Sequence, residues 1–277
     1  GQDAITFQSS SGVAQLGAVR SAIPFMQEKD RDIRQDVAAR LSRVLKAKLE
    51  YAQMRIIGVA DGGRELVRVD RGGPGGSIRI VPDAELMQVG DREYFKRVLG
   101  KPRHNVYASP MVPQDGGVGR SAKPVLYVAV PLWIAGDQVQ GLGVIDVDLG
   151  PRFARILADK DPENEIFIAD GAGEYLLHSG RDRRLPLDAA RPERVQNDFP
   201  GFDGALATGA VNGSGIWKHR NGAQFGVGWA TVNLAGGSAV TVLVAANAAY
   251  LNHGLGVVSS AAQIGGDLVD GPALGPG

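Results

Sequence analysis

The stretch "IADGAGEYLLH" (residues 168–178) decides the fold, because it repeats an earlier one, "VADGGRELVRV" (59–69). Both contain the letters A-D-G-x-x-E after an apolar run, and the copies lie 109 residues apart (169 − 60). Asp-Gly between two short apolar runs is typical of a β-hairpin, because glycine supplies the positive φ angles that such turns need. One chain that builds the same hairpin twice indicates a duplicated domain.

Later strand candidates repeat in the same order. "PVLYVAVPL" and "GLGVIDVDL" close the first cycle, and "GVGWATVNL" and "SAVTVLVAA" stand at the corresponding places in the second. Between hairpin and closing strands, "DREYFKRVL" (91–99) has the pattern of a short helix, and the second cycle has a loop-rich stretch over 180–210. Strands with one helical excursion indicate an α+β fold. We predict two tandem domains, each a central antiparallel sheet with flanking helices or loops.

Residues 11–54 carry apolar residues at steps of three and four, the spacing of a helix with one buried face. The apolar positions are Val13, Leu16, Val19, Ile23, Met26, Ile33, Val37, Leu41, Val44, Leu45 and Leu49. Pro24 is expected to kink the first part, because proline lacks a backbone donor and crowds the preceding turn. A helix of this length would extend for about 60 Å, more than the width of one small domain. We therefore predict a long N-terminal stalk helix.

The domain organisation follows from these patterns and from the length. A chain of 277 residues exceeds the usual size of one domain, roughly 100–150 residues. We predict a stalk helix over 1–54, one domain over 55–150, a second over 151–250 and a flexible or added tail over 251–277. The tail is rich in glycine, alanine and proline and has weak apolar spacing.

Composition excludes several classes of partner and chemistry. Lys plus Arg is 30 and Asp plus Glu is 30, so no net charge attracts nucleic acid or an anionic surface. The absence of cysteine excludes disulfides, thiol catalysis and cysteine-based zinc sites. No run approaches the roughly 20 apolar residues that span a bilayer. The chain begins without methionine, and we interpret it as a piece of a longer protein.

The sequence contains no recognisable pattern of a catalytic or metal site. His104, His178, His219 and His253 stand alone, without the spacing of metal ligands. No G-x-S-x-G elbow, P-loop or dinucleotide fingerprint is present. We therefore predict no catalytic residue, no metal and no cofactor, and rank a hydrolase with an unrecognised site last.

An ordered set of residues resembles a known family. The pattern Y-x-x-x-R, G-x-x-E-x-x-R and R-x-Y-F is matched in chain order by Tyr51, Arg55, Gly62, Glu65, Arg68, Arg92, Tyr94 and Phe95. Together with "VYASP", "KPVLYVAVPLW" and "GLGVIDVDL", this set resembles the double Cache sensor, also described as tandem PAS-like or PDC domains. The family occurs in bacterial transmembrane histidine kinases, chemoreceptors and diguanylate cyclases, and the similarity covers roughly residues 30–250.

The resemblance implies a place and a role. It implies a membrane-distal PAS-like domain that holds a small ligand and a membrane-proximal one. It also implies transmembrane helices on both sides that are absent here, and a position outside the inner membrane. The ligands are amino acids, amines, short carboxylates or sugars. The chain departs from the family where Val89 replaces a frequent lysine and Tyr127 a frequent arginine, which argues against a strongly anionic ligand.

Arginine and tyrosine residues near the predicted short helix are candidate ligand contacts. Arg92 offers a planar fork for a carboxylate, and Tyr94 adds a hydroxyl. Arg55 is a second candidate cation. The alternative is that Arg92 or Arg55 pairs with Glu65 or Asp91 to fix the fold. Arg68, which alternates with valines, is expected to face water.

The strand candidates add further contacts. Tyr107, Ser109 and Tyr127 can point inward, where a tyrosine offers apolar area and one polar group; core packing is the alternative. Asp146 and Asp148 are two residues apart and share a sheet face on a regular strand. A buried carboxylate needs a partner, which is either a ligand ammonium group or an arginine of the chain.

Two functions remain open. The first is a non-catalytic extracytoplasmic sensor of a small polar metabolite, in a receptor of the histidine kinase, diguanylate cyclase or chemoreceptor type. The second is an interaction module without a ligand, which forms a homodimer through the N-terminal helix. Only the first predicts that a small molecule raises the melting temperature.

Overall fold

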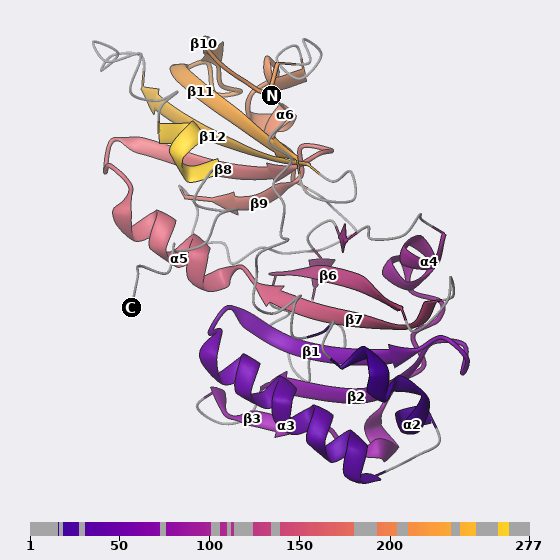
Figure 1. The fold of residues 1–277 in the computed structure, drawn as a ribbon. Coiled ribbons are helices and arrows are strands. Elements are labelled where there is room, and N and C mark those ends of the chain that lie inside the picture. The colour runs from indigo at the N-terminus through magenta and orange to yellow at the C-terminus, as the bar shows by residue number, and fades with distance from the viewer. Residues whose placement is uncertain are drawn as a thin grey trace. The chain divides into compact units, whose positions relative to one another are not determined.

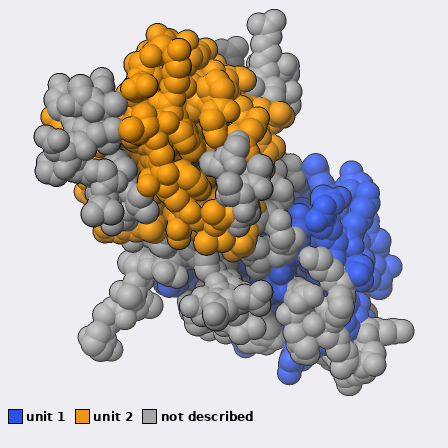
Figure 2. Space-filling view, turned by 90° about the horizontal axis from the view of Figure 1, so that it is seen from above, with its two compact units in different colours: residues 1, 6–149 blue, residues 2–5, 150–277 orange. Residues whose placement is uncertain are grey.

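The computed structural model describes residues 16, 19–27, 31–72, 76–100, 106–109, 112–113, 124–133, 139–179, 193–203, 210–233, 239–247 and 260–265. These residues fall into two compact units, residues 16–149 and residues 150–265 (Figure 2). Each unit has a sheet of its own, and each is described by itself.

The first unit is built on a seven-stranded antiparallel sheet (Figure 1). Its strands are β1 (Tyr51–Gly58), β2 (Arg64–Arg71), β3 (Ile78–Ile80), β4 (Tyr107–Ala108), β5 (Val112–Pro113), β6 (Pro124–Trp133) and β7 (Val139–Asp148). The strand order is β3-β2-β1-β7-β6-β4, and β5 pairs with β6. The central strands β1 and β7 are buried over almost their whole length, as two covered faces require.

Helices cover both faces of this sheet. They are the 3₁₀ helix η2 (Arg20–Ala22), α2 (Ile23–Gln27), α3 (Arg31–Ala47), the 3₁₀ helix η4 (Asp83–Glu85) and α4 (Glu93–Leu99). Tyr94, Phe95 and Val98 of α4 pack on one face of the sheet. On the opposite face of β7, a Cβ added to Gly141 would lie 2.9 Å from Ile23, and one added to Gly143 would lie 2.9 Å from Leu16.

The predicted end of the N-terminal helix at residue 54 is wrong, because α3 ends at Ala47 and β1 begins at Tyr51. Residues 51–54 join the sheet, where they pair with β2 and β7. Nor is α3 a free stalk: one side of it is buried, and it lies across β1, β2 and β3 (Figure 1). The side chain of Arg34 also donates to the carbonyl of Met26 at 2.7 and 2.9 Å, which ties α3 to α2.

The first Asp-Gly turn fixes the segment that precedes α4. Gly62 and Gly63 have φ angles of 65° and 95°, which glycine alone adopts without strain. The amide of Val89 donates to the carbonyl of Gly63 at 2.8 Å. A Cβ on Gly90 would lie 2.1 Å from the carbonyl oxygen of Gly62, so the two backbones touch where no side chain fits.

The second unit repeats the plan with fewer elements. It contains α5 (Gly150–Asp159), β8 (Asn164–Asp170), β9 (Tyr175–His178), α6 (Val195–Asp198), β10 (Asn212–Lys218), β11 (Gln224–Asn233) and β12 (Ala239–Asn247). The strand order is β10-β11-β12-β8-β9, and all pairs are antiparallel. In its own Asp-Gly turn, Asp170 accepts hydrogen bonds from the amides of Ala172 and Glu174, at 2.9 and 2.8 Å.

The duplicated topology is confirmed. The order β2-β1-β7-β6-β4 of the first unit corresponds strand by strand to β9-β8-β12-β11-β10 of the second. The hairpins that begin the two cycles, β1–β2 and β8–β9, are the two Asp-Gly repeats of the sequence. The first unit adds β3 beside β2 and β5 beside β6. The chain is therefore an α+β protein with two copies of one sheet.

Part of the predicted flexible tail is ordered. Residues 260–265 are helical, and Ala261 is fully buried. Small residues permit this packing, because a Cβ on Gly265 would already lie 3.2 Å from Val232. Among the residues that the structure describes, no helix is both long and apolar enough to cross a membrane.

Candidate functional site

Three neighbouring strands of the first unit bring a buried ion pair together. In the register of the sheet, Asp146 on β7 lies opposite Gln53 on β1 and Tyr127 on β6. Arg55, two residues after Gln53, donates from Nη2 to Oδ1 of Asp146 at 2.7 Å. Both members of the pair are at most 1% exposed. The candidates Arg55 and Asp146 therefore meet each other inside the unit.

Two tyrosines enclose the guanidinium of Arg55. Its central carbon lies 5.4 Å from the ring centroid of Tyr94 and 5.5 Å from that of Tyr127, within the range of cation–π contacts. Nη1 also donates to the hydroxyl of Tyr94 at 3.2 Å. The ring centroids are 5.4 Å apart. Since Tyr94 comes from α4, the helix is joined to the sheet through this cation.

The electrostatics favour the charged form of Arg55. Burial by itself lowers the pKa of this guanidinium, but Asp146, Tyr94, Glu65 and Tyr127 together outweigh it and raise the pKa above its ordinary value. Arg55 therefore keeps its charge inside the unit, and the carboxylates that face it are fixed as its partners.

A β-bulge adds Glu65 to this face. The register between β1 and β2 shifts between Ile56 and Ile57, so that Ile57 lies opposite Glu65. The extra residue on β2 places Glu65 on the face of Arg55, although simple alternation would send it to the other side. Oε1 of Glu65 lies 3.5 Å from Nη1 of Arg55.

The expectation that Arg68 faces water is wrong. It lies opposite Arg55 in the β1–β2 register and is only 9% exposed. Nε and Nη2 of Arg68 donate to the two carboxylate oxygens of Asp70 at 2.9 and 3.0 Å. Gln53 donates to the same carboxylate at 2.6 Å. The polar cluster on this face thus extends from Asp146 across β1 to β2.

Some buried polar atoms of this cluster make no hydrogen bond within the described part of the chain. They include the acceptor Oε1 of Gln53, the donor Nε of Arg55, and Oε1 of Glu65, whose contact with Nη1 of Arg55 is an ion pair at 3.5 Å. A buried acceptor without a donor costs about 1–3 kcal/mol. A molecule that supplies N–H or O–H donors to this face would recover that free energy.

The other candidate residues surround the cluster. Tyr107 is buried in the apolar core that also contains Tyr94 and Tyr127. Ser109 exchanges backbone and hydroxyl hydrogen bonds with Tyr127, both at 2.9 Å, which fixes β4 against β6. Arg92 is half-buried and precedes α4 as its N-cap residue. Asp148 is half-buried near the end of β7, where its amide donates to the carbonyl of Glu50 at 2.7 Å.

The corresponding face of the second unit is filled by aromatic side chains. Its core consists of Phe167, Ala169, Val195, Phe199, Phe202, Val227, Trp229, Leu243 and Ala245, with Tyr175, Trp217 and Phe225 against them. Trp217 stacks on Trp229 with centroids 5.3 Å apart. A Cβ on Gly213 would lie 2.3 Å from the ring of Trp229, so only glycine leaves room there.

A buried carboxylate in this unit went unrecognised in the sequence. Asp198 accepts from the hydroxyl of Tyr175 at 2.9 Å and lies 3.0 Å from Nε of Arg220. His178 and His219 lie 3.8 and 3.9 Å from its oxygens. These residues come from three segments that are distant in sequence, β9, α6 and the turn after β10, so no spacing in the sequence reveals them. No set of three His, Asp or Glu side chains in the described residues has the arrangement of a metal site.

The chain was compared with known proteins. No family model and no curated protein matches it. A domain of a sensory box/GGDEF family protein from Vibrio parahaemolyticus matches with a TM-score of 0.67 and 18% identity, over 86% of this chain and 87% of that one. The extracellular domain of the histidine kinase vpHK1S-Z8 gives 0.66 and 17%, over 90% and 85%.

The periplasmic sensory domain of the Campylobacter jejuni chemoreceptor Tlp1 gives a TM-score of 0.61 and 13% identity, over 86% and 88%. The chain therefore has the fold of the extracytoplasmic sensory domains of bacterial receptors. This confirms the fold implied by the resemblance to double Cache sensors.

Proposed function

We propose that the chain is the extracytoplasmic sensory part of a transmembrane receptor and binds a small polar metabolite in its first unit. The observation that carries this proposal is the buried polar cluster of Arg55, Tyr94, Tyr127 and Asp146, between the sheet and α4. Arg55, the buried cation of this cluster, has a raised pKa, and a buried ionisable group with a perturbed pKa and specific charged partners is a candidate for a functional site. The fold supports the location, because similar structures are extracellular or periplasmic.

A histidine kinase is our first candidate for the receptor, and a diguanylate cyclase or a chemoreceptor are the others. The fold suits all three, since the similar structures include a histidine kinase, a GGDEF family protein and a chemoreceptor. In each case the catalytic or signalling domain would lie elsewhere in the parent protein, and this chain would act only as the sensor.

The charges of the cluster narrow the ligand class. Two cations, Arg55 and Arg68, stand among three carboxylates, Glu65, Asp70 and Asp146. Oε1 of Gln53, a buried acceptor without a hydrogen bond among the described residues, adds to this excess of acceptors. Within the class of amino acids, amines and short carboxylates, the cluster favours a ligand that carries an ammonium group. Arg92, Tyr107, Ser109 and Asp148 remain candidates for the rest of the ligand.

Signalling requires that the ligand favours one of two conformations of the sensory chain. A ligand shifts such an equilibrium only by its difference in affinity for the two states, typically about 1–3 kcal/mol. Tyr94 links α4 to Arg55 on β1. A ligand that competes for Arg55 or Asp146 would therefore change how α4 packs on the sheet.

A thermal-shift screen with amino acids, amines and short carboxylates tests the proposal. We expect one class to raise the melting temperature, and Arg92→Ala and Asp148→Ala to reduce that shift. Arg155→Ala, at an exposed position of α5 in the second unit, is the matched control and should leave the shift unchanged. If no library compound moves the melting temperature, ligand sensing by this chain is refuted.

One observation favours the second candidate, an interaction module that binds no ligand. Arg55 and Asp146 neutralise each other at 2.7 Å, so this part of the core is complete without a ligand. A homodimer through the N-terminal helix would then be the working state. Sedimentation that depends on protein concentration, combined with a silent ligand screen, would favour this function over sensing.

A further inference from the structure

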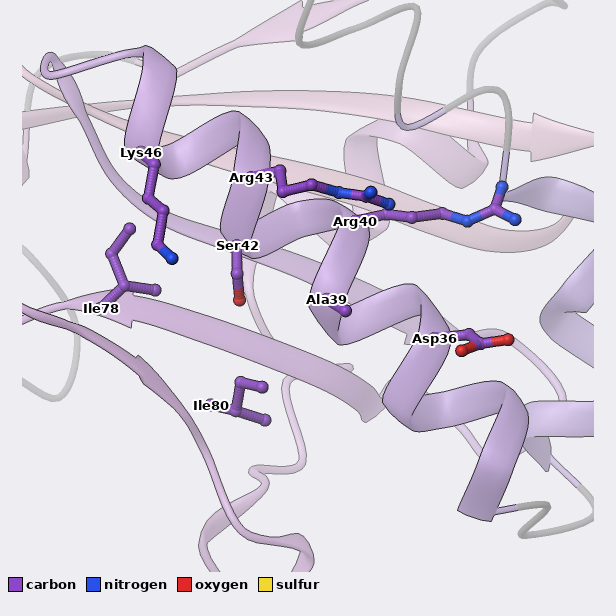
Figure 3. A pocket seen from close by; sticks show the side chains of 8 residues that line it. All are labelled: Asp36, Ala39, Arg40, Ser42, Arg43, Lys46, Ile78 and Ile80. Atoms are coloured by element: carbon purple, nitrogen blue, oxygen red, sulfur yellow. The ribbon is translucent and has the colours of Figure 1, made fainter.

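A groove of about 670 Å³ lies between α3 and β3 on the surface of the first unit, apart from the cluster beneath α4 (Figure 3). Its walls are formed by Asp36, Ala39, Arg40, Ser42, Arg43 and Lys46 of α3 and by Ile78 and Ile80 of β3. β3 is the last strand on its side of the described sheet. The groove is therefore bounded by a helix and by an edge strand.

The strand side of this groove is apolar, and two of the helix residues that line it, Ala39 and Ser42, have small side chains. Ile78 and Ile80 point to the groove because they alternate with Arg79, which pairs with Glu85 instead. Ile80 is 53% exposed, which is unusual for an isoleucine on a strand. Ala39 and Ser42 face the strand without filling the space (Figure 3).

The groove carries an uncompensated positive charge. Arg40, Arg43 and Lys46 contribute three cations and Asp36 one carboxylate. The ion pairs found among the described residues include none of these three cations, whereas the nearby Arg34 is paired with Asp83. Lys46 points toward Ile78 at one end of the groove (Figure 3). Since the whole chain has no net charge, this excess is local and selects an acidic partner.

We propose that this groove binds an extended acidic segment of a partner protein, added as a strand to the outer edge of β3. An edge strand offers unpaired backbone groups, and a groove between a helix and an edge strand is where strand addition occurs in peptide-binding domains. An apolar side chain of the segment packs on Ile78 and Ile80. A carboxylate two residues from it meets Lys46, which points toward Ile78 (Figure 3). A second copy of the chain is disfavoured, because two such grooves repel each other.

The probe is a fluorescent peptide with the sequence Glu-Thr-Val-Thr-Glu, which places valine between two glutamates on one face. Binding to the full chain is measured by anisotropy at low salt. Lys46→Glu and Ile80→Glu should each weaken it by about tenfold or more. Arg155→Glu and Ile216→Glu are the matched controls, because both are exposed in the second unit and Ile216 is 66% exposed. Each control should leave the affinity within about twofold.

Backbone pairing between the peptide and β3 can be tested separately from side-chain binding. The peptide should slow amide hydrogen exchange in β3, and N-methylation of its backbone should abolish binding. The proposal is overturned by no binding at millimolar peptide, or by binding that survives Lys46→Glu and Ile80→Glu. It is equally overturned if N-methylation has no effect. Concentration-dependent sedimentation abolished by Ile80→Glu would assign the groove to a second copy, and binding only to anionic vesicles would assign it to lipid.

Discussion

At the scale of single residues, the pair of Arg55 and Asp146 controls the stability of the first unit. Removing two charges from water is costly, and their attraction repays this only with good geometry and additional contacts. Here the geometry is a 2.7 Å hydrogen bond, and the additional contacts are the rings of Tyr94 and Tyr127. The pair is neutral as a unit, but each member depends on the other.

Replacing one member should therefore cost more than replacing both. Arg55→Met leaves Asp146 buried without its cation, and we expect the free energy of unfolding to fall by about 3–5 kcal/mol. Urea denaturation measures this change. The double variant Arg55→Met/Asp146→Leu should recover part of the loss, because it removes the uncompensated Asp146 but leaves Glu65 without the cation of Arg55. The exposed Arg155→Met should stay within about 0.5 kcal/mol of the unmodified chain. A double variant as unstable as the single one would contradict this account.

Tyr107 predicts an alkaline dependence of stability. Burial raises the pKa of its hydroxyl, although the nearby Arg97 opposes this by lowering it. A tyrosine whose pKa is raised by folding stabilises the protein fully below its unfolded pKa of about 10, and this contribution is lost as the pH rises through the folded value. Urea unfolding between pH 8 and about 11.5 should thus show a shallower alkaline decline for Tyr107→Phe. Parallel curves would contradict the prediction.

At the scale of elements, backbone contacts between glycines hold the first hairpin against the segment before α4. Gly90→Ala would place a Cβ 2.1 Å from the carbonyl oxygen of Gly62, and backbone atoms cannot yield that space cheaply. We expect a loss of more than about 2 kcal/mol, measured by thermal and urea unfolding. Gly72→Ala is the matched control, because nothing lies within 4 Å of its added Cβ. Equal stability of the two variants would contradict this prediction.

Much of the fold could be predicted from local pattern. The Asp-Gly turns, the strand candidates and the repeat depend on glycine, alternation and apolar runs, which are read within a few residues. The end of α3 was misplaced because the residues of β1 fit a helical stripe as well as a strand. Pairing with β2 and β7 decides between the two, and such long-range pairing leaves no local signal.

The candidate site was only partly predictable, for the same reason. The sequence suggested that a carboxylate on β7 meets either a ligand ammonium group or an arginine, and Asp146 meets Arg55. The place of Glu65 depends on a β-bulge, which alternation cannot reveal. The ligand contacts proposed for Arg92 and Asp148 stay predictions. The cluster around Asp198 joins three segments that are distant in sequence, so only the folded chain brings it together.

At the scale of the whole molecule, duplication produced two sheets that share no strand. Each sheet has its own core, so a cavity in one should loosen that one first. Leu41→Ala in α3 should cost about 2–5 kcal/mol and raise amide hydrogen exchange in β1 and β2, but not in β8 and β12. Phe167→Ala should do the reverse. Mass spectrometry of peptide fragments measures both, and a uniform increase across the two sheets would contradict independent cores.

Gly141 and Gly143 couple the position of β7 to that of the N-terminal segment packed against it. One side of β7 carries Asp146, and the other side accepts Leu16 and Ile23 at Gly143 and Gly141 with no room for a methyl group. Because β7 is tightly packed on both faces, a shift of this strand by a fraction of an ångström would also displace Leu16 and Ile23. A movement of the Asp146 carboxylate that shifts β7 would therefore move the N-terminal segment as well. A larger residue at Gly141 or Gly143 would disrupt this coupling, while the face of the sheet that carries Asp146 would stay unchanged.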